Sequence, residues 1–283
     1  MTGIYEKIIR ELKEHIHELE IKLDGDIIVL YGPIGNDLPQ ALVHYVESLA
    51  QHSSKHSKLF VFLTTTGGDA GTVERVVNII RHHYEEVNFV IPDYAYSAGT
   101  ILCMSGDNIY MDYFSVLGPI DPQVYNREGH LVPAQGYLDK INDLLEKARK
   151  GEISEAEFLI LKDFDLAELS EYEQASKLTI ELLETWLVQY KFKNWNSRES
   201  HKDSVTLEMK KVRAKEIAQK LDDHSRWKTH GRPLNLKTLE EIGLRITDYS
   251  GNQELRKMIR GFHSLLTEFL NQNDIRAFIL TGD

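Results

Sequence analysis

Lys58-Leu-Phe-Val-Phe-Leu-Thr64 runs directly into Thr65-Thr-Gly-Gly-Asp69, and this junction indicates the fold. The first part is a short apolar run rich in aromatic residues, typical of a buried strand, and the second is a turn before a helical pattern. Two further strand candidates lie at residues 26–31 and 87–91, and helical patterns at 38–50 and 70–84 separate the three. Because strands and helices alternate, the sequence predicts an α/β fold with parallel strands joined by helical crossovers.

Outward from this core, the chain becomes helical in both directions. Apolar residues recur at helical spacing in 4–20, which predicts an amphipathic N-terminal helix. A polar stretch at 193–202 has the composition of a loop, and a last strand is expected at 277–280. The helical patterns beyond Pro133 cover 134–149, 154–190, 203–221, 236–242 and 253–271.

These patterns divide the chain of 283 residues into four parts. A chain of this length has room for one large domain or two modest ones. We expect an N-terminal amphipathic helix at 1–24, a catalytic core at 25–150, a helical extension or insertion at 151–230 and a C-terminal return to the core at 231–283.

Charge and cysteine content narrow the classes of function. Lys and Arg number 33 against 44 Asp and Glu, and the net charge of −11 argues against nucleic acid or an anionic membrane surface as the main partner. The single cysteine, Cys103, excludes intrachain disulfides and four-cysteine zinc sites, which fits a reducing compartment. No apolar stretch approaches the roughly 18 residues of a membrane span, and the N-terminus lacks the pattern of a secretory signal. We therefore expect a cytoplasmic protein without a direct membrane anchor.

Two turns of small residues lie where a predicted strand ends and a helix begins. They are Thr64-Thr-Thr-Gly-Gly-Asp69 and Tyr94-Ala-Tyr-Ser-Ala-Gly-Thr100. In an open parallel sheet, ligands gather outside the carboxyl ends of the strands, where the first amides of the following helices favour negative charge. Both turns are therefore candidate site segments.

Ser97 is the candidate nucleophile of these turns. The backbone amides of Gly68 and Ala98 would hold the oxyanion, and Gly67 would let the backbone come close to a ligand. The plainer alternative is that the two glycines only make a tight turn and that Ser97 is only a helix N-cap.

Residues 26–123 resemble the Clp protease and crotonase superfamily, and most closely the serine dehydrogenase proteinase family of Clp-class serine peptidases. The motifs are Ile27-Ile-Val-Leu-Tyr-Gly-Pro-Ile34, Thr66-Gly-Gly-Asp-Ala70, Tyr96-Ser-Ala-Gly-Thr100 and Ser115-Val-Leu-Gly-Pro-Ile-Asp-Pro-Gln123. A weaker match joins Gly231-Arg-Pro-Leu to Glu241-Ile-Gly-Leu-Arg245. The resemblance implies a Clp/crotonase-like spiral of βαβ units with additional C-terminal helices.

The resemblance leaves the general base open. Clp proteases carry a histidine where this chain has Asp121, and an ordinary aspartate is a poor proton acceptor for serine at neutral pH. Related peptidases use a Ser-Lys pair with the lysine on the following helix, which favours Lys140. His230, just before the Gly231-Arg element, is the alternative base. Asp121 would then support the site or fix a turn, and Asp69 would support it or cap the helix after the glycines.

Together these observations predict a serine endopeptidase that cleaves peptide bonds through an acyl-enzyme. The alternatives are a crotonase-like acyl-CoA enzyme, which needs no nucleophilic serine, and a non-catalytic scaffold or regulatory subunit. The expected partners are a peptide or protein substrate and further copies of the chain. No cofactor is expected, and the absence of a His-Glu-x-x-His pattern argues against a metal site.

Overall fold

A six-stranded sheet forms the centre of the computed structural model, which describes residues 2–51, 57–125, 129–197 and 204–283. Its strands are β1 (Asp26–Tyr31), β2 (Lys58–Thr64), β3 (Glu86–Ile91), β5 (Asn108–Met111), β10 (Thr247–Asp248) and β11 (Phe278–Thr281). They lie in the order β10-β5-β3-β2-β1-β11, and each neighbouring pair is parallel except β1 and β11. The prediction of an α/β fold built on parallel strands is confirmed.

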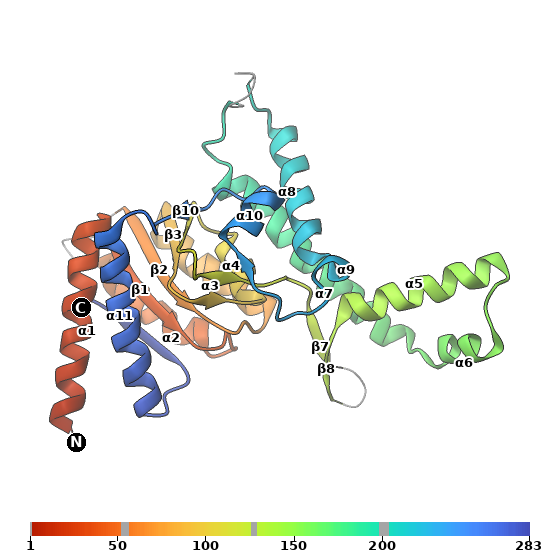
Figure 1. Cartoon of the computed structure of the whole chain (residues 1–283), viewed down its shortest axis with the longest axis horizontal. Coiled ribbons are helices and arrows are strands. Elements are labelled where there is room, and N and C mark those ends of the chain that lie inside the picture. The colour runs from red at the N-terminus through yellow and green to blue at the C-terminus, as the bar shows by residue number, and fades with distance from the viewer. Residues whose placement is uncertain (1, 52–56, 126–128, 198–203) are drawn as a thin grey trace.

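Helices cover both faces of this sheet (Figure 1). Helices α2 (Leu38–Gln51) and α3 (Ala70–His83) pack on the face that carries Ile28 and Leu30. Helices α1 (Thr2–Leu23) and α11 (Gln253–Gln272) lie side by side on the face that carries Ile27 and Val29. Because side chains alternate along a strand, the buried run of β1 supplies apolar groups to both layers.

A small second sheet holds the segments that matter for the site. It contains β4 (Tyr94–Ala95), β6 (Val116–Leu117) and β9 (Leu234–Asn235), in the order β4-β6-β9. Strands β4 and β6 are parallel, whereas β6 and β9 are antiparallel. Helix α4 (Ala98–Cys103) follows β4, and all its residues are buried. The sheet joins the first half of the chain to its C-terminal part.

The middle of the chain is mainly helical. It contains the hairpin β7 (Gln123–Tyr125) and β8 (Leu131–Pro133), then α5 (Ala134–Lys150), α6 (Glu155–Asp163), α7 (Leu166–Trp186), the π-helix η1 (Leu187–Lys191), α8 (Leu207–Asp222), α9 (His224–Trp227) and α10 (Leu236–Ile242). Figure 1 shows the hairpin, α5 and α6 projecting away from the central sheet, while α7 contacts α3 and α4, and α8 packs against α7. Residues of α7 and α8 accordingly belong to the same apolar cluster as α2 and α3.

The helical pattern over 154–190 corresponds to α6, α7 and η1 and not to one continuous helix. The helical conformation is interrupted between α6 and α7, because Asp165 caps α7 by accepting a hydrogen bond of 2.8 Å from Ala167 N. Helix α7 ends in the π-helix η1. The predicted loop at 193–202 is described only to 197, and the rest of it lies outside the described residues, as does the predicted start of the next helix at 203.

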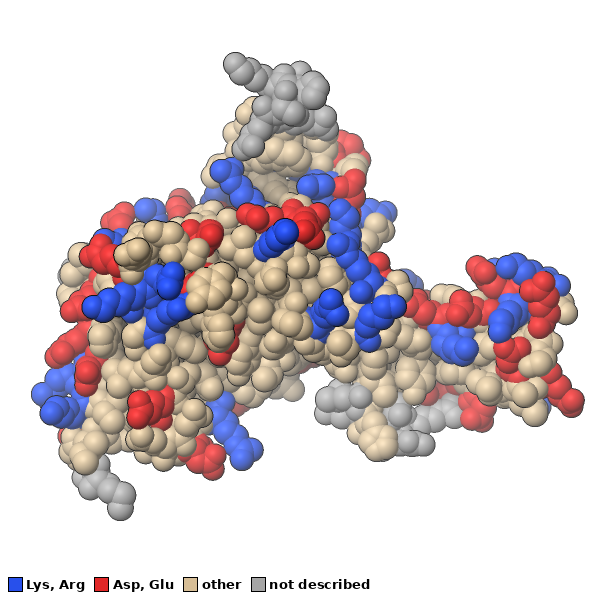
Figure 2. Space-filling model, viewed as in Figure 1, with Lys and Arg blue, Asp and Glu red and all other residues tan. Residues whose placement is uncertain are grey.

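Charges of both signs are interspersed on the face shown in Figure 2. The projecting end formed by α5 and α6 carries acids and bases together, whereas the central area is largely without charge. Among the described residues, no helix combines the length and the apolar character needed to cross a bilayer.

Candidate active site

Ser97 lies in the turn between β4 and α4, and its backbone is strained. Its φ is 53° and its ψ is −118°, a conformation that costs a residue with a side chain about 1 to 3 kcal/mol. The hydroxyl makes no capping hydrogen bond to α4, so the N-cap alternative does not explain the residue. Strain of this kind persists only where the surroundings impose it, and it is common at active sites.

The Gly67-Gly68 turn lies directly against Ser97. A Cβ placed on Gly67, whose φ is +103°, would come within 2.8 Å of the Ser97 Cβ. The turn is held from its other side by Ile34, whose amide donates to Gly67 O at 2.8 Å and whose carbonyl accepts from Asp69 N at 3.1 Å. The structure therefore brings together the two turns that the sequence indicates.

The amides of Gly68 and Ala98 are the donors that this arrangement leaves available. In the part of the chain that the structure describes, neither amide donates a hydrogen bond to another group. Ala98 is the first residue of α4, where helix geometry leaves an amide without an intrahelical acceptor. Two such amides beside a serine hydroxyl can stabilise an oxyanion.

Thr100 links the turn that contains Ser97 to the segment after β6 by hydrogen bonds, a role that the sequence analysis missed. Its hydroxyl lies 2.9 Å from both Ala95 O and Gly118 O and accepts from Gly118 N at 3.0 Å. Gly118 is packed so closely that a Cβ there would lie 3.3 Å from Ser97 N. Only a small hydroxyl residue one turn into α4 can make these contacts, and that position was the available sequence signal.

Asp121 is buried beside two histidines. The carboxylate is 1% exposed, and its Oδ1 lies 2.7 Å from Nδ1 of His230. Its Oδ2 lies 3.4 Å from Nδ1 of His224, a residue that the sequence analysis did not select. Asp121 is therefore the partner of His230, a contact that the sequence analysis did not predict.

A second buried carboxyl, Asp222, lies at the end of α8 near this group. Burial, followed by the negative charge of Asp121, raises the pKa of Asp222 to about 7. Its Oδ2 lies 3.4 Å from the Ser176 hydroxyl of α7, which makes a hydrogen bond to it. The segment after β6 thus meets α7, α8 and α9 at a polar cluster.

Lys140 lies on the exposed side of α5, whose buried residues are Ala134, Ile141 and Leu144. No hydrogen bond or ion pair of its ammonium group occurs among the described residues. Gly136 lies one turn earlier on the same face of α5, and a Cβ placed on it would be 3.5 Å from His224 Nε2. Lys140 is therefore on the side of α5 that faces His224.

Asp69 caps α3, and its Oδ1 accepts a hydrogen bond of 2.6 Å from Thr72 N. This is the capping role that the sequence analysis gave as one of its two possibilities. Asp69 therefore stabilises the N-terminus of α3, the helix that follows the Gly67-Gly68 turn.

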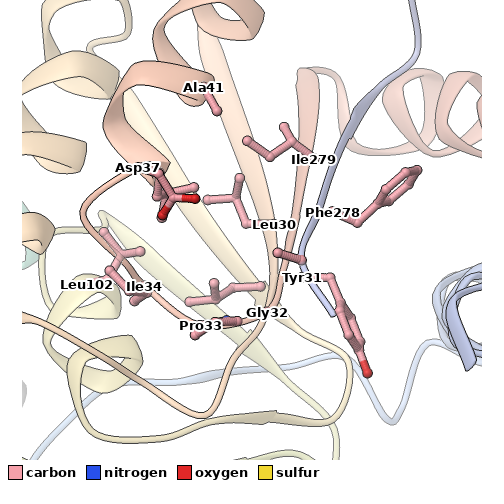
Figure 3. Close-up of a pocket in the computed structure, with 13 residues that line it drawn as sticks. Leu30, Tyr31, Gly32, Pro33, Ile34, Asp37, Ala41, Leu102, Phe278 and Ile279 are labelled. Carbon is pink, nitrogen blue, oxygen red and sulfur yellow. The ribbon is translucent and has the colours of Figure 1, made fainter. Parts of the chain in front are cut away.

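Two cavities open beside the glycine turn at the carboxyl ends of β1 and β2. The first, of about 160 Å³, is mainly apolar and is lined by residues of β1, the start of α2, β11 and Leu102 of α4. Figure 3 shows Ile34, which holds the glycine turn, among its lining side chains, with Asp37 as the charged group. The second, of about 260 Å³, is lined by Thr64, Thr65 and Thr66 and by residues from the end of α11.

No metal site is evident in the described ranges. Among these residues, no group of three or more His, Cys, Asp and Glu side chains has the arrangement of a metal site.

A model of the ClpP-like SDH-type serine proteinases matches residues 50–202, which is more than half of the chain. The uncharacterized protein MJ1495 of Methanocaldococcus jannaschii is 30% identical over 186 residues, covering 66% of this chain and 51% of that protein. The uncharacterized protein MJ0137 of the same organism is 33% identical over 70 residues, covering 25% of this chain and 24% of that protein. The chain spans about half the length, or less, of these curated relatives.

Two solved structures of a 1510-N membrane-bound stomatin-specific protease are among the structures similar to this chain. A variant with a serine replaced by alanine has a TM-score of 0.48 at 13% identity, covering 83% of this chain and 84% of that chain. A lysine variant in complex with a substrate peptide has a TM-score of 0.38 at 15% identity, covering 58% of this chain and 59% of that chain.

Proposed function

Because the chain belongs to the family of ClpP-like SDH-type serine proteinases, we propose that it is a serine endopeptidase with Ser97 as its nucleophile. The observation that carries this proposal is the strained Ser97 backbone, at φ 53°, held against the Gly67-Gly68 turn. A serine that served only to cap α4 would have no reason to adopt this conformation. A nucleophile that must project from a turn beside two free amides does.

In the proposed reaction, the Ser97 hydroxyl oxygen attacks the carbonyl carbon of a peptide bond. The amides of Gly68 and Ala98 donate hydrogen bonds to the oxygen that becomes negatively charged. An acyl-enzyme forms as the amine leaves, and water then releases the acyl group. Removal of one oxyanion donor typically lowers kcat by about 10²- to 10³-fold, so these two amides supply several kcal/mol of transition-state stabilisation.

A base must take the Ser97 proton, and Lys140 and His230 are the two candidates. Two observations favour Lys140 as the base: the family resemblance, and its position on the side of α5 that faces His224. A lysine accepts a proton only when its surroundings hold it neutral, and Lys140 is exposed, so a substrate or a second copy of the chain would have to cover it. For His230, the contact with Asp121 argues in favour.

The remaining parts of the proposal concern the protein's setting. The proposed substrate is a peptide or protein, and the proposed setting is a homo-oligomer in the cytoplasm. A net charge of −11 disfavours nucleic acid as a partner.

Peptide cleavage tests the proposal. Purified protein is incubated with casein and with a library of short fluorogenic peptides, alongside the variant Ser97→Ala. The account predicts cleavage by the wild type that falls at least about 10³-fold in the variant, because the nucleophile is lost. Cleavage of equal rate in both proteins would show that Ser97 is not the nucleophile.

A further inference from the structure

The ring of His230 and the carboxylate of Asp121 form a pair at the sheet that carries Ser97. The geometry points to His230 as the general base of the proposed peptidase, with Asp121 as the residue that positions its ring. This inference rests on the proposed role of Ser97 and deepens it, since it names the group that moves the proton.

Strand pairing puts the three residues at one edge of the small sheet. Strands β4 and β6 are parallel, so Ser97 and Asp121, which follow them, leave the sheet at the same edge. Strand β9 is antiparallel to β6, so His230, which precedes β9, approaches that edge from the other direction. Extending the pairing of Leu117 with Leu234 by four residues along each strand brings Asp121 opposite His230.

Asp121 lies close along the chain to a residue that packs against Ser97. That residue is Gly118, with 3.3 Å between a Cβ placed on it and Ser97 N. Asp121 follows Gly118 by three residues, which span at most about 10 Å of extended chain. The carboxylate that holds His230 is therefore within about this reach of the Ser97 turn.

The contact with Asp121 leaves one ring nitrogen of His230 available. The distance between Nδ1 and Asp121 Oδ1 is 2.7 Å, so a neutral ring donates its Nδ1 proton to the carboxylate and presents an unprotonated Nε2. Asp121 is 1% exposed whereas His230 is 25% exposed, so the carboxylate is fixed inside the protein and the ring remains accessible. This is the division of roles between a base and its orienting carboxylate in a serine hydrolase.

Other charged groups also face this pair. His224 of α9 lies 3.4 Å from the second oxygen of Asp121, and a Cβ placed on Gly136 of α5 would lie 3.5 Å from its Nε2, so this ring lies between Asp121 and α5. Asp222 of α8 has a repulsive electrostatic interaction with Asp121.

Each proton of the proposed reaction passes through His230 Nε2. The Ser97 proton moves to His230 Nε2 while the Oγ–C bond forms and the carbonyl π electrons move to the oxygen. The same proton passes from Nε2 to the amide nitrogen as the C–N bond breaks. Water then gives a proton to Nε2 while its oxygen bonds the acyl carbon, and Ser97 Oγ leaves with that proton.

Matched variants test the assignment in the full-length protein. Cleavage of the best fluorogenic peptide is measured for His230→Gln, His230→Ala, Lys140→Ala and, as a control histidine on the exposed side of α2, His44→Gln. Loss of a general base lowers kcat by about 10²- to 10⁴-fold, which is expected for both His230 variants. His44→Gln should stay within about 3-fold of the wild type, and Lys140→Ala should lose less activity than either His230 variant.

Imidazole in solution separates a catalytic role from a structural one. The account predicts that added imidazole restores part of the activity of His230→Ala, because the small molecule can take the proton in the space of the missing ring. The variant should also melt close to the wild type. A variant that is inactive and shows no rescue although it is folded contradicts the assignment.

Asp121→Asn tests the positioning role. Its kcat should fall while KM changes little, because the ring is no longer held in the orientation that takes the proton. A folded Asp121→Asn protein with wild-type kcat, or one in which only KM changes, contradicts the role.

The two levels of the proposal fail in different ways. One outcome is that Ser97→Ala and Lys140→Ala both abolish cleavage while His230→Gln stays active. The proposal of a serine peptidase would then hold, but its general base would be Lys140. If the wild type cleaves nothing, the proposed function fails and this inference fails with it.

Discussion

The substitution Gly68→Ala places a methyl group where the structure has only backbone. A Cβ at this position would lie 2.1 Å from Ile34 O and 2.7 Å from Ile34 C, on a residue whose φ is +157°. Because both close atoms belong to the main chain, no side chain can rotate away. Ile34 is also hydrogen-bonded to Gly67 and Asp69 on either side of Gly68, so it cannot retreat alone.

The contact requires the glycine turn to move by about 1 Å, since Cβ atoms essentially never approach other atoms closer than 3.0 Å. Overpacking of this kind typically costs about 1 to 3 kcal/mol of unfolding free energy. The larger effect is on catalysis, because the Gly68 amide leaves the position at which it meets the oxyanion. Loss of one such donor lowers kcat by about 10²- to 10³-fold.

The assay combines peptide cleavage with denaturant unfolding, and Gly261→Ala is the control. Gly261 lies inside α11 with no atom within 4 Å of a built Cβ, so alanine there should stabilise the helix by about 1 kcal/mol and leave cleavage unchanged. For Gly68→Ala, kcat should fall while KM remains similar. A folded Gly68→Ala protein with wild-type kcat would refute the placement of the oxyanion donors.

Three further predictions concern stability. Ser97→Gly should unfold at a free energy about 1 to 2 kcal/mol higher than Ser97→Ala, because glycine adopts φ 53° without strain; equal values in urea titrations would mean that the backbone is not strained. Asp107→Ala should destabilise by about 3 to 5 kcal/mol, since it leaves the buried Arg81 guanidinium, 2.9 Å from the carboxylate, without its partner; a loss below about 1 kcal/mol contradicts this. Asp222 has a native pKa near 7 against 3.8 as its ordinary value, so the native state binds more protons and stability falls as pH rises from about 4 to 7. Asp222→Asn should flatten this dependence by up to about 4 kcal/mol, and a variant with the wild-type slope between pH 4 and 8 would contradict it.

The parallel core could be predicted because its signals are local. The runs at 26–31, 58–64 and 87–91 are mainly apolar and almost entirely buried, as is typical of strands covered on both faces. The edge strand at the C-terminus was expected at 277–280, but its antiparallel direction was not, because the apolar pattern of a short strand is the same in both directions.

The break at Phe164 had a local signal that a longer pattern hid. Asp165 is a favoured N-cap residue, but the surrounding stretch continues at helical spacing. Helix α6 contacts α5 but buries none of its residues, and its Phe158, Leu159 and Ile160 are exposed. The spacing of apolar residues therefore overestimated the length of one helix.

The proximity of the Ser97 turn and the Gly67-Gly68 turn could likewise be predicted, since both turns follow strands and ligand sites gather at the carboxyl ends of parallel strands. The contact between Asp121 and His230 could not, because the two residues are 109 positions apart. They meet through β6 and β9, strands of two residues each, which are too short to show a period. His224 and Thr100 were missed for the related reason that their roles are defined only by their neighbours in space.

The central claim is that Ser97 is an activated nucleophile, and covalent labelling tests it most directly. The protein is incubated with a fluorophosphonate probe, digested and analysed by mass spectrometry. The account predicts one adduct on the peptide that contains Ser97, which neither Ser97→Ala nor heat-unfolded protein forms. The absence of an adduct on folded wild-type protein, or an adduct on another serine at the same rate in Ser97→Ala, would contradict the account and favour an acyl-CoA enzyme or a non-catalytic scaffold.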